Sequence, residues 1–198
     1  MMDGSEIKKV AKSLSGLISS YLLFKSTASK EEADKVLGLD LTSYMMYLSA
    51  SDGHVSQREA RKISEYMSSP ITPESINNIV RTMNIHSAKF EQTVPFSLMV
   101  LVQTDNESWD NGDGDCCIAD ILVELFETVG CELIGADGDI DDVEMSDMRM
   151  YINMMNDYIM QNDKIKIYGD ERSDTYKNEN RNYNKSLMKT GVSAPRKR

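Results

Sequence analysis

Two stretches of sequence resemble each other, SASDGHVSQRE at residues 49–59 and IGADGDIDDVE at residues 134–144. In each, small residues close an apolar segment, an Asp-Gly pair follows, and a Glu lies six residues after the glycine. The Asp-Gly pairs occupy positions 52–53 and 137–138, 85 residues apart. This repeat indicates an internal duplication, with two halves related by pseudo-twofold symmetry.

Each copy contains what a tight turn between two helices requires. Glycine readily adopts the left-handed conformation that closes the preceding helix. Ser56 or Asp141 can then cap the next helix, and Glu59 or Glu144, three residues later, completes a capping box. These features explain a helical hairpin without any ligand.

The same acids also allow a second interpretation, which is divalent-cation binding. An Asp-Gly pair followed by Val or Ile and later by Glu forms the second half of a calcium-binding EF-hand loop. The first half is absent, because its ligand positions fall on Leu48 and Ala50 in one copy and on Leu133 and Gly135 in the other. A cation site would therefore pool oxygen ligands from both copies or include backbone carbonyls. Both interpretations stay open on spacing alone.

Apolar residues recur at helical spacing through most of the chain, and no strand alternation occurs. Ser29 with Glu32 predicts a capping box that opens a helix, which we expect to break near Gly38 before another helix begins at Asp40. The acidic, glycine-containing residues 104–115 predict a loop between the two halves. The expected fold is an all-α bundle of about seven helices.

Charge divides the chain into two parts. Residues 1–161 hold 12 Lys and Arg against 27 Asp and Glu, whereas residues 162–198 hold 10 against 5. Helical spacing also fades beyond residue 161. We therefore predict a helical domain at residues 1–161 and a basic, flexible tail at residues 162–198. The acidic body argues against nucleic-acid binding, because phosphates would be repelled.

Location is constrained by what the sequence lacks. No apolar run approaches the roughly 20 residues needed to span a bilayer. The N-terminal residues do not form a signal-peptide pattern. The three cysteines form neither a disulfide framework nor a zinc-binding spacing. We expect a cytoplasmic protein that is not an integral membrane protein.

The two motifs resemble the signature segments of the TerB-like family, which is associated with tellurite resistance and stress responses. That pattern reads ADG, a variable residue, a hydrophobic residue, Ser or Asp, two variable residues and Glu, once in each half of a helical domain. This chain has SDGHVSQRE in the first copy and ADGDIDDVE in the second. The resemblance covers roughly residues 5–161. The chain departs from the pattern at Ser51 and His54.

The resemblance implies a seven-helix bundle of two related halves and a non-catalytic regulatory adaptor in a stress-response or defence system. It also implies a divalent-cation site, most naturally for Ca²⁺, that is formed by acids of both Asp-Gly turns. The implied metal ligands are Asp52, Glu59, Asp137, Asp139, Asp141 and Glu144. A partner protein is expected, such as an ATPase or a membrane-associated complex to which the chain binds peripherally. The alternative is an adaptor that binds its partner without metal.

Overall fold

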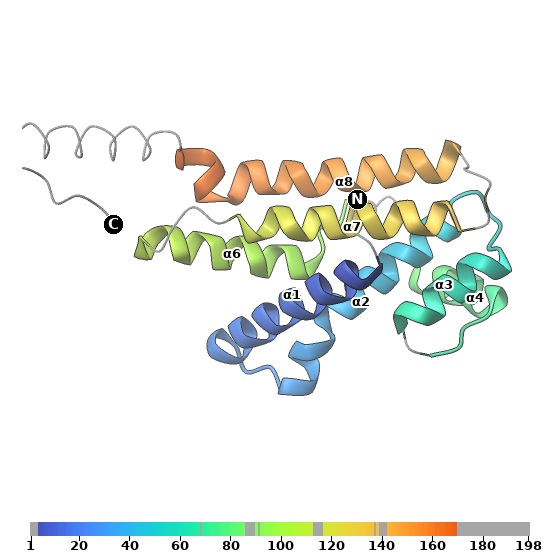
Figure 1. Cartoon of the computed structure of the whole chain (residues 1–198), viewed down its shortest axis with the longest axis horizontal. Coiled ribbons are helices and arrows are strands. Elements are labelled where there is room, and N and C mark those ends of the chain that lie inside the picture. Colours follow the sequence, from blue (N-terminus) through green and yellow to red (C-terminus); the bar gives the residue numbers. More distant parts are fainter. Residues whose placement is uncertain are drawn as a thin grey trace, which may run out of the picture.

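The computed structural model describes most of the chain, and the described part is entirely helical outside its turns. The described residues are 4–67, 69–85, 90, 92–112, 117–136, 138 and 142–169. The helices in this part are α1 (Gly4–Lys25), α2 (Lys30–Ser49), α3 (Gln57–Met67), α4 (Pro73–Met83), α6 (Phe96–Asn111), α7 (Ile118–Ile134) and α8 (Asp142–Asn162). A further helical segment covers residues 164–169. No strand occurs among the described residues, so the expected all-α bundle is confirmed (Figure 1).

Helices α2 and α7 are the two central helices of the bundle, and α7 is the more apolar. Helix α7 packs against α1, α2, α3, α6 and α8. Figure 1 shows α8 along one side of α7, with α1 and α2 along the other. Most of α7 is apolar, and its side chains from Ala119 to Ile134 include ten that are buried. Burying this surface removes apolar area from water, which supplies the main favourable contribution to the stability of the fold.

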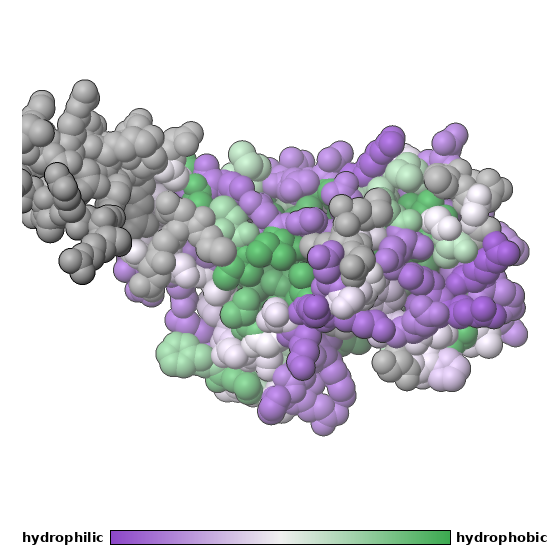
Figure 2. All heavy atoms as spheres, viewed as in Figure 1, coloured by the Kyte–Doolittle hydropathy of each residue, from purple (hydrophilic) through white to green (hydrophobic). Residues whose placement is uncertain are grey.

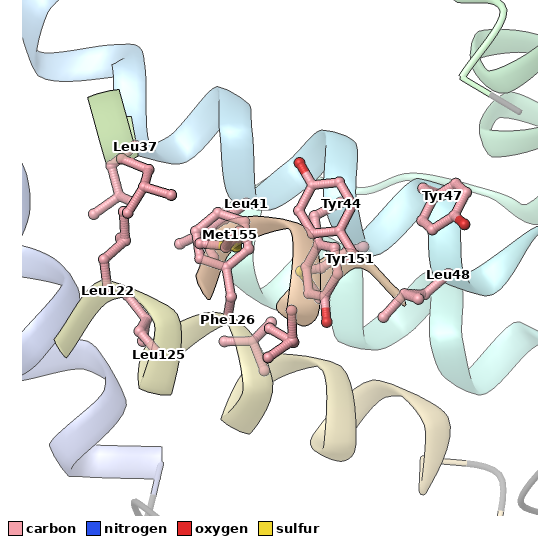
Figure 3. Close-up of a cluster of buried hydrophobic side chains, with 14 of the residues drawn as sticks. Leu37, Leu41, Tyr44, Tyr47, Leu48, Leu122, Leu125, Phe126, Tyr151 and Met155 are labelled. Carbon is pink, nitrogen blue, oxygen red and sulfur yellow. The ribbon is translucent and has the colours of Figure 1, made fainter. Parts of the chain in front are cut away.

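Aromatic side chains connect α2, α7 and α8 in the core (Figure 3). The ring of Tyr44 lies 5.1 Å from that of Phe126 and 4.9 Å from that of Tyr151, between ring centroids. The rings are tilted against each other, as aromatic pairs prefer. Gly130 allows this close packing, because a Cβ atom there would lie 2.5 Å from the hydroxyl oxygen of Tyr44.

Helix α2 is continuous, so the expected break near Gly38 is wrong. The capping box at Ser29 and Glu32 is confirmed, since each residue's side chain accepts a hydrogen bond from the other's backbone N–H. Glycine inside a helix costs about 1 kcal/mol relative to alanine. Leu37 and Leu41 are both buried on either side of it, and their burial outweighs this cost.

The predicted loop at residues 104–115 is wrong for residues 104–111, which form the end of α6. The acidic side chain of Asp105 is fully buried and caps the N-terminus of α7 instead of facing solvent. Its two oxygens accept hydrogen bonds from the backbone N–H groups of Ile118 (3.0 Å) and Ala119 (2.9 Å). Helix α6 then ends at Gly112, whose φ of 79° is left-handed. Residues 113–116 lie outside the described residues.

A similar contact holds the beginning of α6. Pro95 is the N-cap residue and offers no side-chain hydrogen bond. Asp40 of α2 supplies the missing acceptor, because its Oδ2 accepts a hydrogen bond of 2.7 Å from the N–H of Ser97. Both α6 and α7 are therefore capped by a carboxylate from another helix.

Residues 162–169 pack on the body, in contrast to the tail expected from residue 162. Asp163 is fully buried, and its Oδ1 accepts a hydrogen bond from the N–H of Ile165. Asn106 binds both the carbonyl of Asn162 and the N–H of Lys164. The remainder of the predicted tail lies outside the described residues. None of the described helices combines the length and apolar character that crossing a bilayer requires.

Candidate functional site

The first Asp-Gly turn joins α2 to α3 and has the expected backbone conformation. Gly53 has a φ of 83°, which is left-handed, and its N–H donates to the carbonyl of Ala50. Asp52 is exposed, and its Oδ1 accepts a hydrogen bond of 2.7 Å from the N–H of His54. One oxygen of this predicted metal ligand is therefore already used to stabilise the turn.

Glu59 completes a capping box with Ser56. Its Oε2 accepts a hydrogen bond of 2.7 Å from the N–H of Ser56, and its own N–H donates to the Ser56 hydroxyl oxygen. The side chain is only 4% exposed. Its second oxygen, Oε1, is buried and has no hydrogen-bond partner among the described residues. The capping role predicted from sequence is confirmed here, while this unpaired oxygen is not explained by it.

The second turn matches the first wherever it is described. Gly138 has a φ of 87°, and the N–H of Ala136 donates to the carbonyl of Leu133. Glu144 is the third residue of α8, as Glu59 is of α3, and is likewise buried. Three predicted ligands, Asp137, Asp139 and Asp141, lie outside the described residues.

Both turns lie at one end of the bundle. Ala136, just before the second Asp-Gly pair, lines a small hollow together with Arg58 and Arg61, which follow the first pair. Even so, no three His, Cys, Asp or Glu side chains gather into a metal-binding group within the described part of the chain. The described ligands Asp52, Glu59 and Glu144 thus do not form a cation site by themselves.

A groove lined by lysines lies next to these turns, and sequence reasoning missed it. This lysine groove has a volume of about 1050 Å³. Its lysines are Lys8, Lys9 and Lys12 of α1 and Lys62 of α3. Ala11 and Tyr66, both partly buried, also line it and give it an apolar component, whereas Ile7 is only 1% exposed. Lys8 and Lys12 lie one turn apart, a spacing that the sequence shows, but the position of α3 opposite them could not be read from it.

Glu132 of α7 fixes the side of the groove formed by α3. It pairs with the ammonium of Lys62 at 2.7 Å and accepts a hydrogen bond of 3.3 Å from the Tyr66 hydroxyl. Burial, together with the negative charge of Glu132, raises the pKa of Tyr66 well above its usual range. The phenol therefore stays protonated and remains a donor to Glu132 at neutral pH.

Positive charge is concentrated around α3. Two smaller hollows adjoin the lysine groove and share residues with it, including Glu65. Six of the twelve Lys and Arg residues within residues 1–161 line these three hollows. Lys8, Lys9 and Lys12 form no ion pair with any described residue. The described part of a strongly acidic body thus presents a basic surface beside α3.

Comparison of the chain with models of known protein families, with curated proteins and with solved structures finds no match. The TerB-like resemblance accordingly rests on the two Asp-Gly motifs, and it stays a prediction. The geometry alone defines two features at one end of the bundle. These are the two Asp-Gly turns, both with left-handed glycines, and the adjoining lysine groove.

Proposed function

We propose that the chain is a non-catalytic adaptor module that holds a partner protein in the lysine groove. The observation that carries this proposal is a partly apolar groove on an acidic body whose three α1 lysines form no ion pair with any described residue. The other lysines that the structure describes all form ion pairs, as in Lys25–Glu107 and Lys30–Asp34.

Electrostatics supports a binding role for this surface. Residues 1–161 carry a net charge of −15, so the lysine groove attracts acidic groups that most of the body repels. Complementary charge steers association and selects partners more than it adds affinity. The apolar side chains between the lysines supply area that a partner can bury.

Site-specific photocrosslinking in a cell lysate tests this proposal. A photoreactive residue replaces Lys9, which lines the groove, and in a matched control it replaces Ser13, an exposed residue of the same helix outside it. We expect a protein adduct at position 9, absent at position 13 and lost when Lys8→Glu and Lys12→Glu are added. Equal adducts at both positions, or none at position 9, would overturn the proposal.

Divalent-cation binding at the Asp-Gly turns is a second candidate, and it is the role that the TerB-like resemblance implies. The buried Oε1 of Glu59, which has no described hydrogen-bond partner, favours it. A carboxylate oxygen buried without a partner is costly, and a cation would offset that cost. Under this proposal, further oxygen ligands come from the acids of the second turn. An ATPase or membrane-associated partner and a cytoplasmic location stay predictions.

A further inference from the structure

The lysine groove has the architecture of a site for a helix. Its walls come from α1 and α3, and both of these helices pack on α7, which contributes Glu132 to the lining. The lining residues are the N-terminal turns of α1 on one side and Lys62, Glu65 and Tyr66 of α3 on the other. Amphipathic helices of partner proteins dock into grooves with their apolar face inward.

Size argues for a polypeptide segment over a small anion. Sites for small molecules typically enclose about 300–1,000 Å³, and the groove, at about 1050 Å³, is slightly larger than that range and far larger than an inorganic anion. Ala11 of α1 and Tyr66 of α3 line the groove and are only partly buried by the rest of the protein. An inorganic anion would leave this apolar surface uncovered, whereas apolar side chains of a helix would bury it.

The lysines of the groove determine which charge a docked helix should carry. Lys8 and Lys12 lie one helical turn apart, and Lys9 lies beside them. Carboxylates spaced three or four residues apart on a docked helix match this interval, because such residues share one helix face. A nucleic acid is a poorer match, because the body's net charge of −15 repels an extended polyanion.

We infer that the lysine groove binds an acidic amphipathic helix of a partner protein, with apolar side chains directed at Ala11 and Tyr66 and carboxylates at Lys8, Lys9 and Lys12. This inference rests on the proposed function, since it names the chemistry of the partner held in the same groove. Lys62 contributes less to this recognition, because Glu132 already pairs with it.

The test is selection from a displayed library of random 16-residue peptides on the full chain. Enriched peptides are expected to carry excess Asp and Glu and apolar residues at helical spacing. Their affinity, measured by fluorescence anisotropy in 50 mM NaCl, should fall about tenfold or more with Lys8→Glu/Lys12→Glu. The control Lys30→Glu/Lys35→Glu changes the charge equally on α2, outside the groove, and should change affinity less than threefold.

Each other outcome overturns the inference. Neutral or basic enriched peptides, unstructured polyglutamate binding equally well, or equal binding by the two double variants would each do so. Dimerisation of the wild type that Lys8→Glu/Lys12→Glu abolishes would assign the groove to a second copy instead. Circular dichroism checks that the Lys8→Glu/Lys12→Glu variant folds. If that variant does not fold, Lys8→Gln/Lys12→Gln is used in its place. If position 9 crosslinks a protein through a non-acidic segment, the inference fails while the proposed function stands.

Discussion

Replacing Asp105 with Asn should remove a pH dependence from the stability of the fold. The Asp105 carboxylate is fully buried. Burial, reinforced by the charges of Asp163 and Asp120, raises its pKa to about 6 despite the hydrogen bonds from the N–H groups of Ile118 and Ala119. The folded chain therefore keeps a proton here that the unfolded chain, with a pKa near 3.8, has already lost.

The sign and size of the effect follow from proton linkage. Between about pH 4 and pH 6 the folded state binds more protons at Asp105 than the unfolded state does, so the free energy of unfolding falls as pH rises. The stabilising contribution is complete below pH 4 and is lost above pH 6. A shift of about two pKa units corresponds to about 3 kcal/mol. Asn resembles the protonated carboxyl and does not titrate. The free energy of unfolding of the variant, relative to that of wild type, should therefore rise by about 3 kcal/mol from pH 4 to pH 7.

Urea unfolding followed by circular dichroism at several pH values between 4 and 8 measures this difference. Other titrating groups cancel when the variant is compared with wild type at each pH. Asp110→Asn is a matched control on the same helix, because Asp110 is exposed and pairs with Lys164, and it should change stability by less than about 1 kcal/mol. The reasoning would be refuted if the difference in free energy of unfolding between Asp105→Asn and wild type changed by less than about 1 kcal/mol across this pH range, or changed in the opposite direction.

Three further predictions concern packing, capping and cation binding. Gly130→Ala should destabilise the fold by about 1–3 kcal/mol, because the new Cβ would meet the Tyr44 hydroxyl at 2.5 Å; an unchanged melting temperature would contradict this packing. Asp40→Ala should cost about 1–2 kcal/mol in urea unfolding by leaving the N–H of Ser97 without its acceptor, and Asp40→Asn should restore most of the loss. If the turns bind calcium with a Kd of about 0.1 mM, 10 mM CaCl₂ should add about 2.7 kcal/mol to wild type and less to Glu59→Gln; a calorimetric titration without heat would exclude such a site.

Local features of the fold were readable from the sequence. The capping boxes at Ser29 and Ser56 need only a side chain and a backbone group three residues away, so short-range spacing is enough to predict them. Gly53 and Gly138 likewise have the left-handed conformation that a helix end requires. For this reason the all-α fold and both hairpin turns were predictable.

Features that depend on residues distant in the chain could not be predicted from the sequence. The sequence predicts a loop at Asp105, because nothing nearby in the sequence indicates that its carboxylate caps α7. The lysine groove needs α1 and α3 to stand on opposite sides of it, which no local pattern specifies. In the predicted cation site, Asp52 and Glu59 each use a carboxylate oxygen for their own turn. Asp137, Asp139 and Asp141 lie outside the described residues, so convergence of the acids stays a prediction.

The capping of α6 by Asp40 and of α7 by Asp105 affects how the chain folds. Helix α6 lacks an acceptor at its N-terminus until α2 has docked, and α7 lacks one until α6 has formed. The Asp40–Ser97 contact closes a loop of 57 residues, and closing a loop of that length carries an entropic cost. The helices should therefore form together in one cooperative transition, and a fragment ending before Pro95 would leave Asp40 without the backbone group that it binds.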